Sequence, residues 1–282
     1  PPIVLGHENS GVVTKVGSEV TNVKPGDRVT VDPNIYCGQC KYCRTQRPEL
    51  CEHLDAVGVT RNGGFEEYFT APAKVVYPIP DDVSLKAAAV VEPISCAMHG
   101  VDLLETHPYQ KALVLGDGFE GQLFAQILKA RGIHEVTLAG RSDEKLENNR
   151  KHFGVKTINT TKEEIPADAY DIVVEAVGLP ATQEQALAAA ARGAQVLMFG
   201  VGTRDDKFSV NTYDVFQKQL TIQGAFINPY TFEDSIALLS SGVVDPLPLF
   251  SHELDLDGVE DFVSGKLGKV SKAVVKVGGE EA

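Results

Sequence analysis

Four cysteines in one short stretch constrain this chain more than any other feature of its sequence. They follow the spacing C-x2-C-x2-C-x7-C, at Cys37, Cys40, Cys43 and Cys51. Four thiolates held this closely can complete a tetrahedral shell around one zinc ion. Because such a shell has no open position for a substrate, we predict a structural zinc lobe over residues 37–51.

Two other uses of clustered cysteines fit the spacing less well. The compact iron–sulfur motif of bacteria places three residues before its last cysteine and a proline after it. Here seven residues separate Cys43 from Cys51, and Glu52 follows. Disulfides would suit a secreted protein, but nothing else in the sequence favours secretion. The remaining cysteine, Cys96, lies apart, in a position that suits helix packing.

Composition narrows the classes of partner. The chain has 282 residues and a formal net charge of −13, which suits one large or two medium domains. An acidic surface argues against nucleic acids and anionic membranes as partners, and no apolar run reaches the length of a membrane span. Because the thiols are largely confined to the cysteine cluster, we expect a protein of the reducing cytoplasm, with a small-molecule substrate. Because the sequence opens with Pro1 as if inside a folded element, we also expect a segment to precede it.

The pattern of apolar residues, glycines and prolines changes near residue 84. Before it, β-branched residues punctuated by Gly and Pro predict short strands of a small barrel or sandwich, including residues 64–70. After it, a helix capped by Ser84 is predicted over residues 84–92. Solid apolar runs then alternate with helices, which indicates an α/β domain with a parallel sheet covered on both faces. The clearest helices are 182–192 and 231–241, and a last strand is expected from Ala273.

A glycine motif follows the first of these apolar runs. Leu113-Val-Leu is followed by the pattern GxGxxG, formed by Gly116, Gly118 and Gly121, and then by an apolar face at helical spacing. Glycines let the backbone approach a pyrophosphate, and the helix N-terminus offers free N–H groups. An ordinary glycine turn is the alternative, but the strand–turn–helix context favours a dinucleotide-binding Rossmann domain.

The end of the next apolar run bears on the choice of coenzyme. An NAD-selective domain usually places an acid there to hold the ribose 2′-hydroxyl, and this chain has Gly140. Arg141 and Ser142 suit a 2′-phosphate, which favours NADP over NAD, unless Arg141 is simply a solvated loop residue. Within the glycine motif, the acids Asp117 and Glu120 would repel a phosphate if they faced it. We also assign Val177 and Gly178, which follow Ile172-Val-Val, to the coenzyme site.

A second metal site is suggested by His7 and Glu8 in Gly6-His7-Glu8. They offer a nitrogen and an oxygen ligand, although a lone His-Glu pair is more often structural. Glu92, in Val90-Val-Glu-Pro, is a third candidate, and its alternative role is solvation at a helix terminus.

These motifs together resemble the medium-chain zinc-dependent alcohol dehydrogenases. The family's zinc signature is matched by the pattern Gly6-His7-Glu8-x2-Gly11-x5-Gly17-x2-Val20. The cysteine lobe and the glycine motif fall where the family has its structural zinc and its Rossmann domain. The resemblance implies a GroES-like β-rich catalytic domain, N-terminally truncated here, over residues 1–94, a doubly wound Rossmann domain over 95–229, and a return to the catalytic domain over 230–282.

The resemblance also implies a ligand set for the catalytic zinc. Many alcohol dehydrogenases use two cysteines and a histidine, whereas this chain has Glu92 at the place of the second cysteine. That resembles the sorbitol and polyol dehydrogenase branch, in which Cys, His and Glu hold the metal. His7 and Glu92 would be ligands, and Glu8 would hold the site directly or through water. The family's upstream ligand cysteine and its proton-relaying Ser or Thr are expected in the segment before Pro1.

The implied activity is hydride transfer between NADP(H), or less favourably NAD(H), and a polyol/ketose pair, phosphorylated or not. The catalytic residues would be His7, Glu8 and Glu92, and the enzyme would be a homodimer or homotetramer. Three alternatives stay open: a zinc-stabilised NADP-binding scaffold without catalysis, a threonine-type dehydrogenase, and a quinone-type reductase. The cysteine lobe and Gly6-His7-Glu8 count against the last, because quinone reductases generally lack the zinc ligands.

Overall fold

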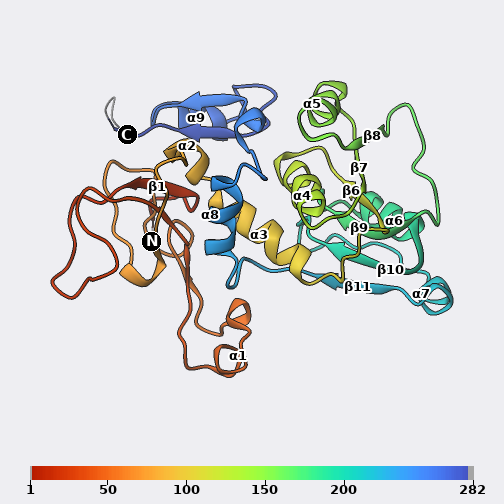
Figure 1. Cartoon of the computed structure of the whole chain (residues 1–282), viewed down its shortest axis with the longest axis horizontal. Coiled ribbons are helices and arrows are strands. Elements are labelled where there is room, and N and C mark those ends of the chain that lie inside the picture. Colours follow the sequence, from red (N-terminus) through yellow and green to blue (C-terminus); the bar gives the residue numbers. More distant parts are fainter. Residues whose placement is uncertain (1, 279–282) are drawn as a thin grey trace. The chain divides into compact units, whose positions relative to one another are not determined.

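The computed structural model describes residues 2–278, and its contacts divide the chain into two compact units. Unit 1 comprises the chain up to Cys96 and again from Ile227, and unit 2 comprises Ala97–Phe226. Figure 1 shows the helices and strands of each unit along the chain. The α/β class predicted from the sequence is confirmed by a six-stranded parallel sheet in unit 2 and antiparallel strands in unit 1.

The parallel sheet of unit 2 has the strand order β11-β10-β9-β6-β7-β8. Counted from β6 along the chain, this is the 3-2-1-4-5-6 order of a doubly wound dinucleotide-binding fold. Leu113 and Val114 in β6 are fully buried, as expected for strands covered on both faces. The strands are β6 (Lys111–Leu115), β7 (Glu135–Gly140), β8 (Lys156–Asn159), β9 (Tyr170–Glu175), β10 (Ala190–Met198) and β11 (Thr221–Gly224).

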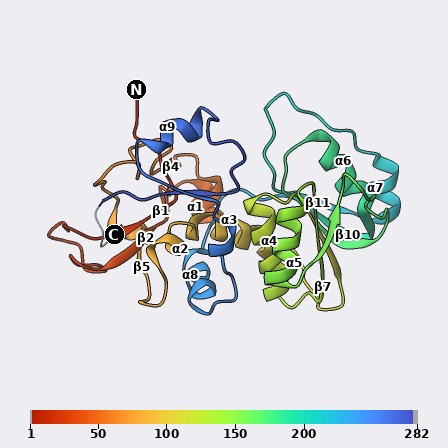
Figure 2. The same ribbon diagram turned by 90° about the horizontal axis from the view of Figure 1, so that it is seen from above.

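Helices connect these strands and cover both faces of the sheet. Figure 2 shows α4 and α5 on one side of the sheet and α6 and α7 on the other. This arrangement follows from right-handed crossovers that run in opposite directions from the centre of the sheet. The helices are α4 (Phe119–Ala130), α5 (Asp143–Phe153), α6 (Pro180–Ala189) and α7 (Thr212–Lys218).

Unit 1 is built from three small sheets and short helices. Strands β1 (Asn9–Val12), β2 (Arg28–Val31) and β5 (Val76–Pro78) form an antiparallel sheet. The pairs are β3 (Asn34–Ile35) with β4 (Asp55–Ala56), antiparallel, and β12 (His252–Leu254) with β13 (Ala273–Val275), parallel. The helices are α1 (Lys41–Arg44), α2 (Leu85–Ala88), α8 (Phe232–Ser240), α9 (Gly258–Val263) and the 3-10 turns η1 (Pro48–Leu50), η2 (Ala73–Val75) and η3 (Leu247–Leu249); α3 (Val91–Asp102) contains residues of both units.

Two predicted helices differ from the structure. The helix predicted over 84–92 is two helices, because α2 ends at Ala88 and α3 begins at Val91. Ser84 does cap α2, where its hydroxyl accepts from the N–H of Ala87 at 3.1 Å. Glu92 therefore lies in the first turn of α3 and does not follow a helix terminus. The helix predicted over 182–192 ends at Ala189, because β10 begins at Ala190.

The strand predicted over residues 64–70 is absent, and bends occupy residues 64–68. The backbone N–H of Gly64 donates to the carbonyl of Gly6 at 2.9 Å, and that of Phe65 donates to Leu5 at 3.0 Å. These bonds tie the segment to the chain next to His7 instead of continuing a sheet. Among the helices of residues 2–278, none has the length and apolar character needed to cross a bilayer.

Candidate functional site

The cysteine lobe has the geometry of a tetrahedral metal site. Its four thiols each offer a sulfur within 4.8 Å of the others. Sγ of Cys43 lies 3.9 Å from Sγ of Cys37 and 3.6 Å from Sγ of Cys40. A tetrahedron with zinc–sulfur bonds of about 2.3 Å has edges of about 3.8 Å, so these separations fit zinc. All four are free thiols in the structure and form no disulfide.

Backbone N–H groups converge on the same sulfurs. The N–H groups of Cys37 and His53 donate to Sγ of Cys51, each at 3.4 Å. The N–H groups of Cys43 and then Glu52 lower the pKa of the Cys40 thiol to about 6. Loss of solvent raises the pKa of the Cys43 thiol, so a cation is needed for all members of the cluster to be thiolates together.

A second set of donors lies where the chain enters β1. His7 and Glu8 immediately precede Asn9, the first residue of β1, and Glu92 lies in the first turn of α3. One ligand atom from each of His7, Glu8 and Glu92 lies within 4.8 Å of the other two. His7 is exposed, Glu8 is partly exposed and Glu92 is buried. The structure thus brings Glu92 next to a pair of residues that lies more than eighty positions before it in the sequence.

Close backbone packing fixes the position of His7. A Cβ atom at Gly58 would lie 2.1 Å from the carbonyl oxygen of Gly6, and one at Gly63 would lie 2.2 Å from it. Only glycine permits such an approach. The side-chain amide of Asn9 also donates to that carbonyl, at 3.0 Å. The peptide preceding His7 is therefore held from three directions, which fixes the backbone from which its imidazole projects.

Lys272 is a member of this site that the sequence analysis missed. Its Nζ lies 2.7 Å from Oε1 and 2.5 Å from Oε2 of Glu8, and its side chain is only 17 % exposed. The two residues are 264 positions apart, so no local pattern could have linked them. The ion pair orients the Glu8 carboxylate and neutralises part of the acidic charge in the site.

The donor set fits a divalent cation with an open position. Burial, and after it the charge of Glu8, raises the pKa of the Glu92 carboxyl to about 8. A buried carboxyl in this position needs a proton or a cation beside it. One nitrogen and two carboxylate oxygens are donors that catalytic zinc accepts, with a further position left for substrate or water. Cys96, whose Sγ donates to Oε1 of Glu92 at 3.3 Å, lies beside this set.

The glycine motif of unit 2 forms the turn between β6 and α4. Gly116 has φ +116°, and a Cβ on it would lie 2.9 Å from the side chain of Val177. A Cβ on Gly121 would lie 1.8 Å from the carbonyl oxygen of Gly116. Gly118, which precedes the first turn of α4, faces open space, with nothing within 4 Å of a Cβ built there. This open space beside a helix N-terminus fits a pyrophosphate.

The two acids of the motif have different roles. Glu120 lies in the first turn of α4, where a carboxylate interacts favourably with the helix dipole. The Asp117 carboxylate instead accepts from the backbone N–H groups of Arg141 and Ser142, each at 2.7 Å. Asp117 thus faces the end of β7, the strand that the sequence analysis associated with the coenzyme ribose.

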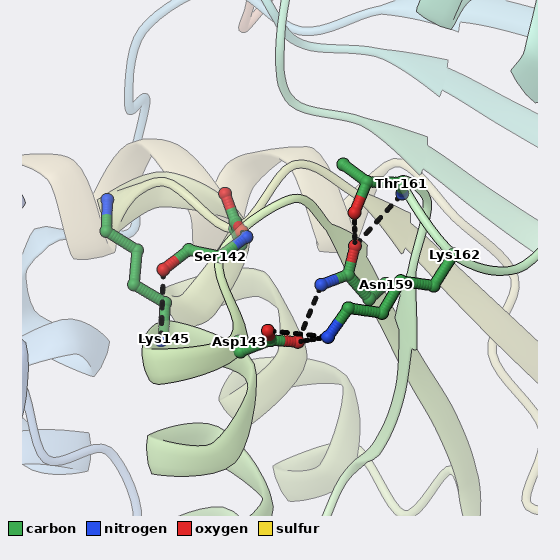
Figure 3. A network of polar contacts seen from close by, with 7 residues as sticks. Ser142, Asp143, Lys145, Asn159, Thr161 and Lys162 are labelled. Carbon is green, nitrogen blue, oxygen red and sulfur yellow. Dashed lines mark hydrogen bonds and ion pairs between the residues drawn. The ribbon is translucent and has the colours of Figure 1, made fainter.

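Further contacts hold the segment that carries Arg141 and Ser142. Ser142 caps α5, accepting from the N–H of Lys145 at 3.4 Å. The side chain of Asp143 accepts from the amide of Asn159 at 2.7 Å and forms an ion pair with Lys162 (Figure 3). A pocket of about 430 Å³ beside this network is lined by Asp143, Leu146, Glu147, Thr157, Asn159, Lys162 and Glu163.

The predicted pair Val177 and Gly178 lies at the carboxyl end of β9, next to β6 in the sheet. A fully buried carboxylate fixes this turn: Glu175 accepts from the N–H groups of Val177 and Gly178, both at 3.0 Å. The hydroxyl of Thr182 donates to the same carboxylate at 2.7 Å. Val177 is brought against Gly116, so both turns lie where the strand order reverses, which is the ligand crevice of open α/β sheets.

Comparison with known proteins gives matches in both units. Residues 1–81 match the family model for the alcohol dehydrogenase GroES-like domain, and residues 121–241 match that for zinc-binding dehydrogenases. A solved structure of a zinc-binding dehydrogenase from Sinorhizobium meliloti, bound to NADP, superposes with a TM-score of 0.92. It is 32 % identical, and the alignment covers 98 % of this chain and 83 % of that one.

Curated relatives of similar closeness fall into two groups. D-arabinitol dehydrogenase 1 from Uromyces fabae is 32 % identical, with 92 % of this chain and 77 % of the relative covered. D-altritol 5-dehydrogenase from Agrobacterium fabrum is 33 % identical, with 94 % and 80 % covered. L-threonine 3-dehydrogenase from Bacillus velezensis is also 33 % identical, with 95 % and 81 % covered.

Proposed function

Since this chain belongs to the zinc-dependent medium-chain alcohol dehydrogenase family, we propose that it oxidises a polyol to the corresponding ketose, or reduces the ketose, with a nicotinamide coenzyme. The family resemblance inferred from Gly6-His7-Glu8, the cysteine lobe and the glycine motif is confirmed. The chain is thus of a zinc-dependent oxidoreductase class, and the choice of polyol and the roles of single residues are our proposals.

The proposed metal ligands follow from the two donor sets. Cys37, Cys40, Cys43 and Cys51 would hold a structural zinc, because their sulfurs are spaced as a tetrahedron requires. His7 and Glu92 would hold the catalytic zinc, with Glu8 as a third donor oriented by Lys272.

The proposed coenzyme is NADP(H), with NAD(H) as the alternative. Gly116, Gly118 and Gly121 would admit the pyrophosphate to the N-terminus of α4. Arg141, whose side chain is exposed, and Ser142 would meet the 2′-phosphate. Val177 and Gly178 would line the crevice beyond β9, held by Glu175.

The chemistry then divides between the bound groups and the chain. When bound, zinc supplies Lewis-acid polarisation of the substrate oxygen, and the nicotinamide supplies the hydride acceptor. His7 and Glu92 keep the donor set in place, the former through its clamped backbone and the latter through the first turn of α3. Lys272 orients the Glu8 carboxylate through their ion pair. The Glu175 turn fixes the backbone of the coenzyme crevice.

The observation that carries this proposal is the convergence of His7, Glu8 and Glu92 in a chain so similar to two polyol dehydrogenases. The test is to incubate the purified protein with D-arabinitol, D-altritol and galactitol, each with NADP⁺ and NAD⁺, and to follow reduced nicotinamide. We expect oxidation of at least one polyol, lost on chelation and restored by zinc.

A pair of histidine variants sharpens that test. His7→Ala removes a proposed ligand, so it should abolish turnover and lower the zinc content by about one ion per chain. His134→Ala, at an exposed position of unit 2, should keep both. If His7→Ala retains full zinc content and activity, the proposed catalytic site is wrong.

A second candidate substrate is L-threonine, because the curated relatives include threonine 3-dehydrogenases as similar as the polyol enzymes. The same assay decides between them. Turnover of L-threonine and of none of the polyols would favour this second candidate, and it would keep the metal and coenzyme sites. Absence of turnover with every substrate, together with bound coenzyme, would favour a scaffold without catalysis.

We further propose a homo-oligomer in the cytoplasm. Strand β11 is a sheet edge, and apolar side chains near it are exposed: Phe216 by 81 %, Tyr213 by 62 % and Ile222 by 37 %. A symmetric copy could pair along this edge and cover them. A reducing compartment would keep the lobe thiols available to zinc. Light scattering of the purified protein tests the oligomer, and a monomer at micromolar concentration would contradict it.

A further inference from the structure

In unit 2, a glycine occupies a position where an acid is expected, and an acid occupies a position in the neighbouring turn where a small neutral residue is expected. The end of β7, where an acid usually holds the coenzyme ribose, is occupied by Gly140. The glycine motif, where a small neutral residue would leave most room for phosphates, contains Asp117. An acid is therefore missing from one loop and present in the adjacent one.

The geometry connects the two positions. A Cβ built on Gly140 would lie 2.3 Å from both Cβ and Cγ of Asp117 and 2.4 Å from its Oδ2. The Asp117 side chain thus fills the space into which a side chain at position 140 would project. An Asp at position 140 could not coexist with Asp117, and the carboxylate at the end of β7 is supplied from the neighbouring turn.

The two oxygens of this carboxylate are used differently. Oδ2 accepts from the backbone N–H groups of Arg141 and Ser142, each at 2.7 Å. Oδ1 takes no hydrogen bond from any residue between 2 and 278, and Asp117 is partly exposed. One oxygen therefore fixes the carboxylate, and the other is left to accept from a ligand hydroxyl.

The same contacts disfavour a phosphate. Paired N–H groups next to the N-terminus of an eleven-residue helix, α5, would otherwise suit an anion. Here the Asp117 carboxylate takes both N–H groups. A 2′-phosphate beside them would lie near a fixed negative charge, and the exposed side chain of Arg141 would offset part of the repulsion.

We infer that Asp117 determines coenzyme selectivity: it stands in for the missing acid at the end of β7, accepts from the ribose 2′-hydroxyl of NAD(H), and weakens the binding of NADP(H). This inference rests on the coenzyme site of the proposed function. Arg141 and Ser142 attract the 2′-phosphate and Asp117 opposes it, so the intact protein binds both coenzymes with a selectivity set by these opposed contacts.

The first test is calorimetric and does not depend on turnover. Dissociation constants for NADP⁺ and NAD⁺ are measured with the wild type, Asp117→Asn and the control Glu144→Gln. The Asn side chain can still accept from one N–H but has no charge, so the ratio of NAD⁺ to NADP⁺ dissociation constants should rise by about tenfold or more. Glu144→Gln removes an exposed carboxylate from the first turn of α5 that does not bond Arg141 or Ser142, and it should change the ratio less than about threefold.

A double variant that moves the carboxylate from position 117 to position 140 tests whether Asp117 takes the place of the missing acid. Asp117→Gly alone should weaken NAD⁺ binding by about tenfold, because the ribose loses its acceptor. Asp117→Gly combined with Gly140→Asp places the carboxylate at the end of β7, in the space that Asp117 vacates. The double variant should recover NAD⁺ affinity and keep low affinity for NADP⁺.

The outcomes separate this inference from the function on which it rests. If the wild-type protein binds neither coenzyme, the proposed coenzyme site is wrong. A wild type that binds both, with the same ratio within twofold in Asp117→Asn, would overturn the role of Asp117 and leave the dehydrogenase intact. Circular dichroism of each variant excludes misfolding, and Asp117→Asn decides the question even if the double variant does not fold.

Discussion

Cys40 illustrates how much a single side chain decides in the zinc lobe. Its thiol is buried and receives N–H groups that lower its pKa to about 6, which favours its thiolate form, the form that binds a metal. Cys96 offers a matched comparison, because it lies outside the lobe and forms no disulfide. Comparing a substitution of Cys40 with one of Cys96 distinguishes an effect on the lobe from the general effect of losing a thiol.

We predict that Cys40→Ser loses the lobe metal. Structural zinc contributes about 10–16 kcal/mol in zinc-finger peptides, and a hydroxyl is a poor replacement for a thiolate ligand. In cobalt-substituted protein, the sulfur-to-metal absorption bands should disappear in Cys40→Ser and persist in Cys96→Ser. Bands of full intensity in Cys40→Ser would show that the metal is not held by these four sulfurs.

Asp32 makes folding stability depend on pH. It is 6 % exposed, and burial raises the pKa of its carboxyl from 3.8 to about 6. Between these values the folded state binds more protons than the unfolded state, so the free energy of unfolding falls as pH rises from about 4 to 6. The loss is complete above the folded-state pKa and amounts to about 3 kcal/mol at most.

Asp32→Asn should therefore gain stability over the wild type with rising pH. Its amide oxygen can still accept from the N–H of Asn34, which donates to Asp32 at 3.0 Å, but it does not titrate. Urea unfolding at pH 5 and pH 7.5 gives the difference in unfolding free energy between the two proteins. Groups that titrate alike in both proteins do not contribute to this difference. A difference that stays constant with pH would contradict the raised pKa.

At the scale of elements, the loop around Gly58 acts as a support for His7. Gly58 has φ +75° and lies against the carbonyl of Gly6. Gly26, in the same unit, has φ +93° with open space around it. An alanine at either position would have a positive φ, and only the one at position 58 would collide with the chain that carries the proposed metal ligands His7 and Glu8.

We predict that Gly26→Ala costs about 1 kcal/mol of unfolding free energy, from positive φ alone. Gly58→Ala should cost about 3 kcal/mol or more, because the backbone before His7 must move. Chemical denaturation measures both, and zinc analysis should show metal lost only from Gly58→Ala. Equal costs in the two variants would mean that the close approach does not position His7.

Elements with a strong period were predictable from the sequence, and boundaries with weak local preference were not. The strand–glycine–helix unit around Gly116 was predicted because each part has its own pattern. The predicted helix over 182–192 overran into β10, because alanines at 188–191 suit a helix and a buried strand equally. The segment from Gly64 was predicted as a strand, but its bonds to Leu5 and Gly6 are tertiary.

Some residues of the candidate sites were predictable from sequence motifs, and others depend on the fold. His7, Glu8 and Glu92 were chosen by motif and resemblance, and their convergence is a property of the fold. Lys272 was missed because its partner is 264 residues away. Asp117 was noted only as an obstacle to phosphate. Its position beneath Gly140 depends on the spacing of two turns, which no single-sequence pattern encodes.

At the scale of the whole molecule, a buried polar cluster joins the two sequence segments of unit 1. Asn228 is fully buried, donates to the hydroxyl of Ser95 at 2.7 Å and accepts from the amide of Asn34 at 2.7 Å. Loss of its side chain would leave both partners short of a hydrogen bond in an apolar interior. The cost should be confined to the unit that contains them.

We predict that Asn228→Ala destabilises unit 1 by about 2–4 kcal/mol. Hydrogen exchange followed by mass spectrometry should show faster exchange in β1, β2 and α8, with the parallel sheet β6–β11 unchanged. Asn211→Ala, which removes the cap that accepts from the N–H of Tyr213 in unit 2, is the reciprocal control. If hydrogen exchange in Asn228→Ala is faster by the same factor in both units, the prediction that the destabilisation is confined to unit 1 is wrong.

The division of unit 1 into two sequence segments has a consequence for how the protein is made. The ribosome must add 194 residues after Asn34 before it reaches the partner Asn228. At about 5–20 residues per second, that is an interval of about 10–40 s. The β-rich segment up to Cys96 emerges before the strands and helices of the second segment of unit 1, which begins at Ile227, whereas unit 2 is continuous in sequence and can fold first. The first segment of unit 1 therefore lacks its packing partners during that interval, and exposed apolar surface in this state is the kind that chaperones protect.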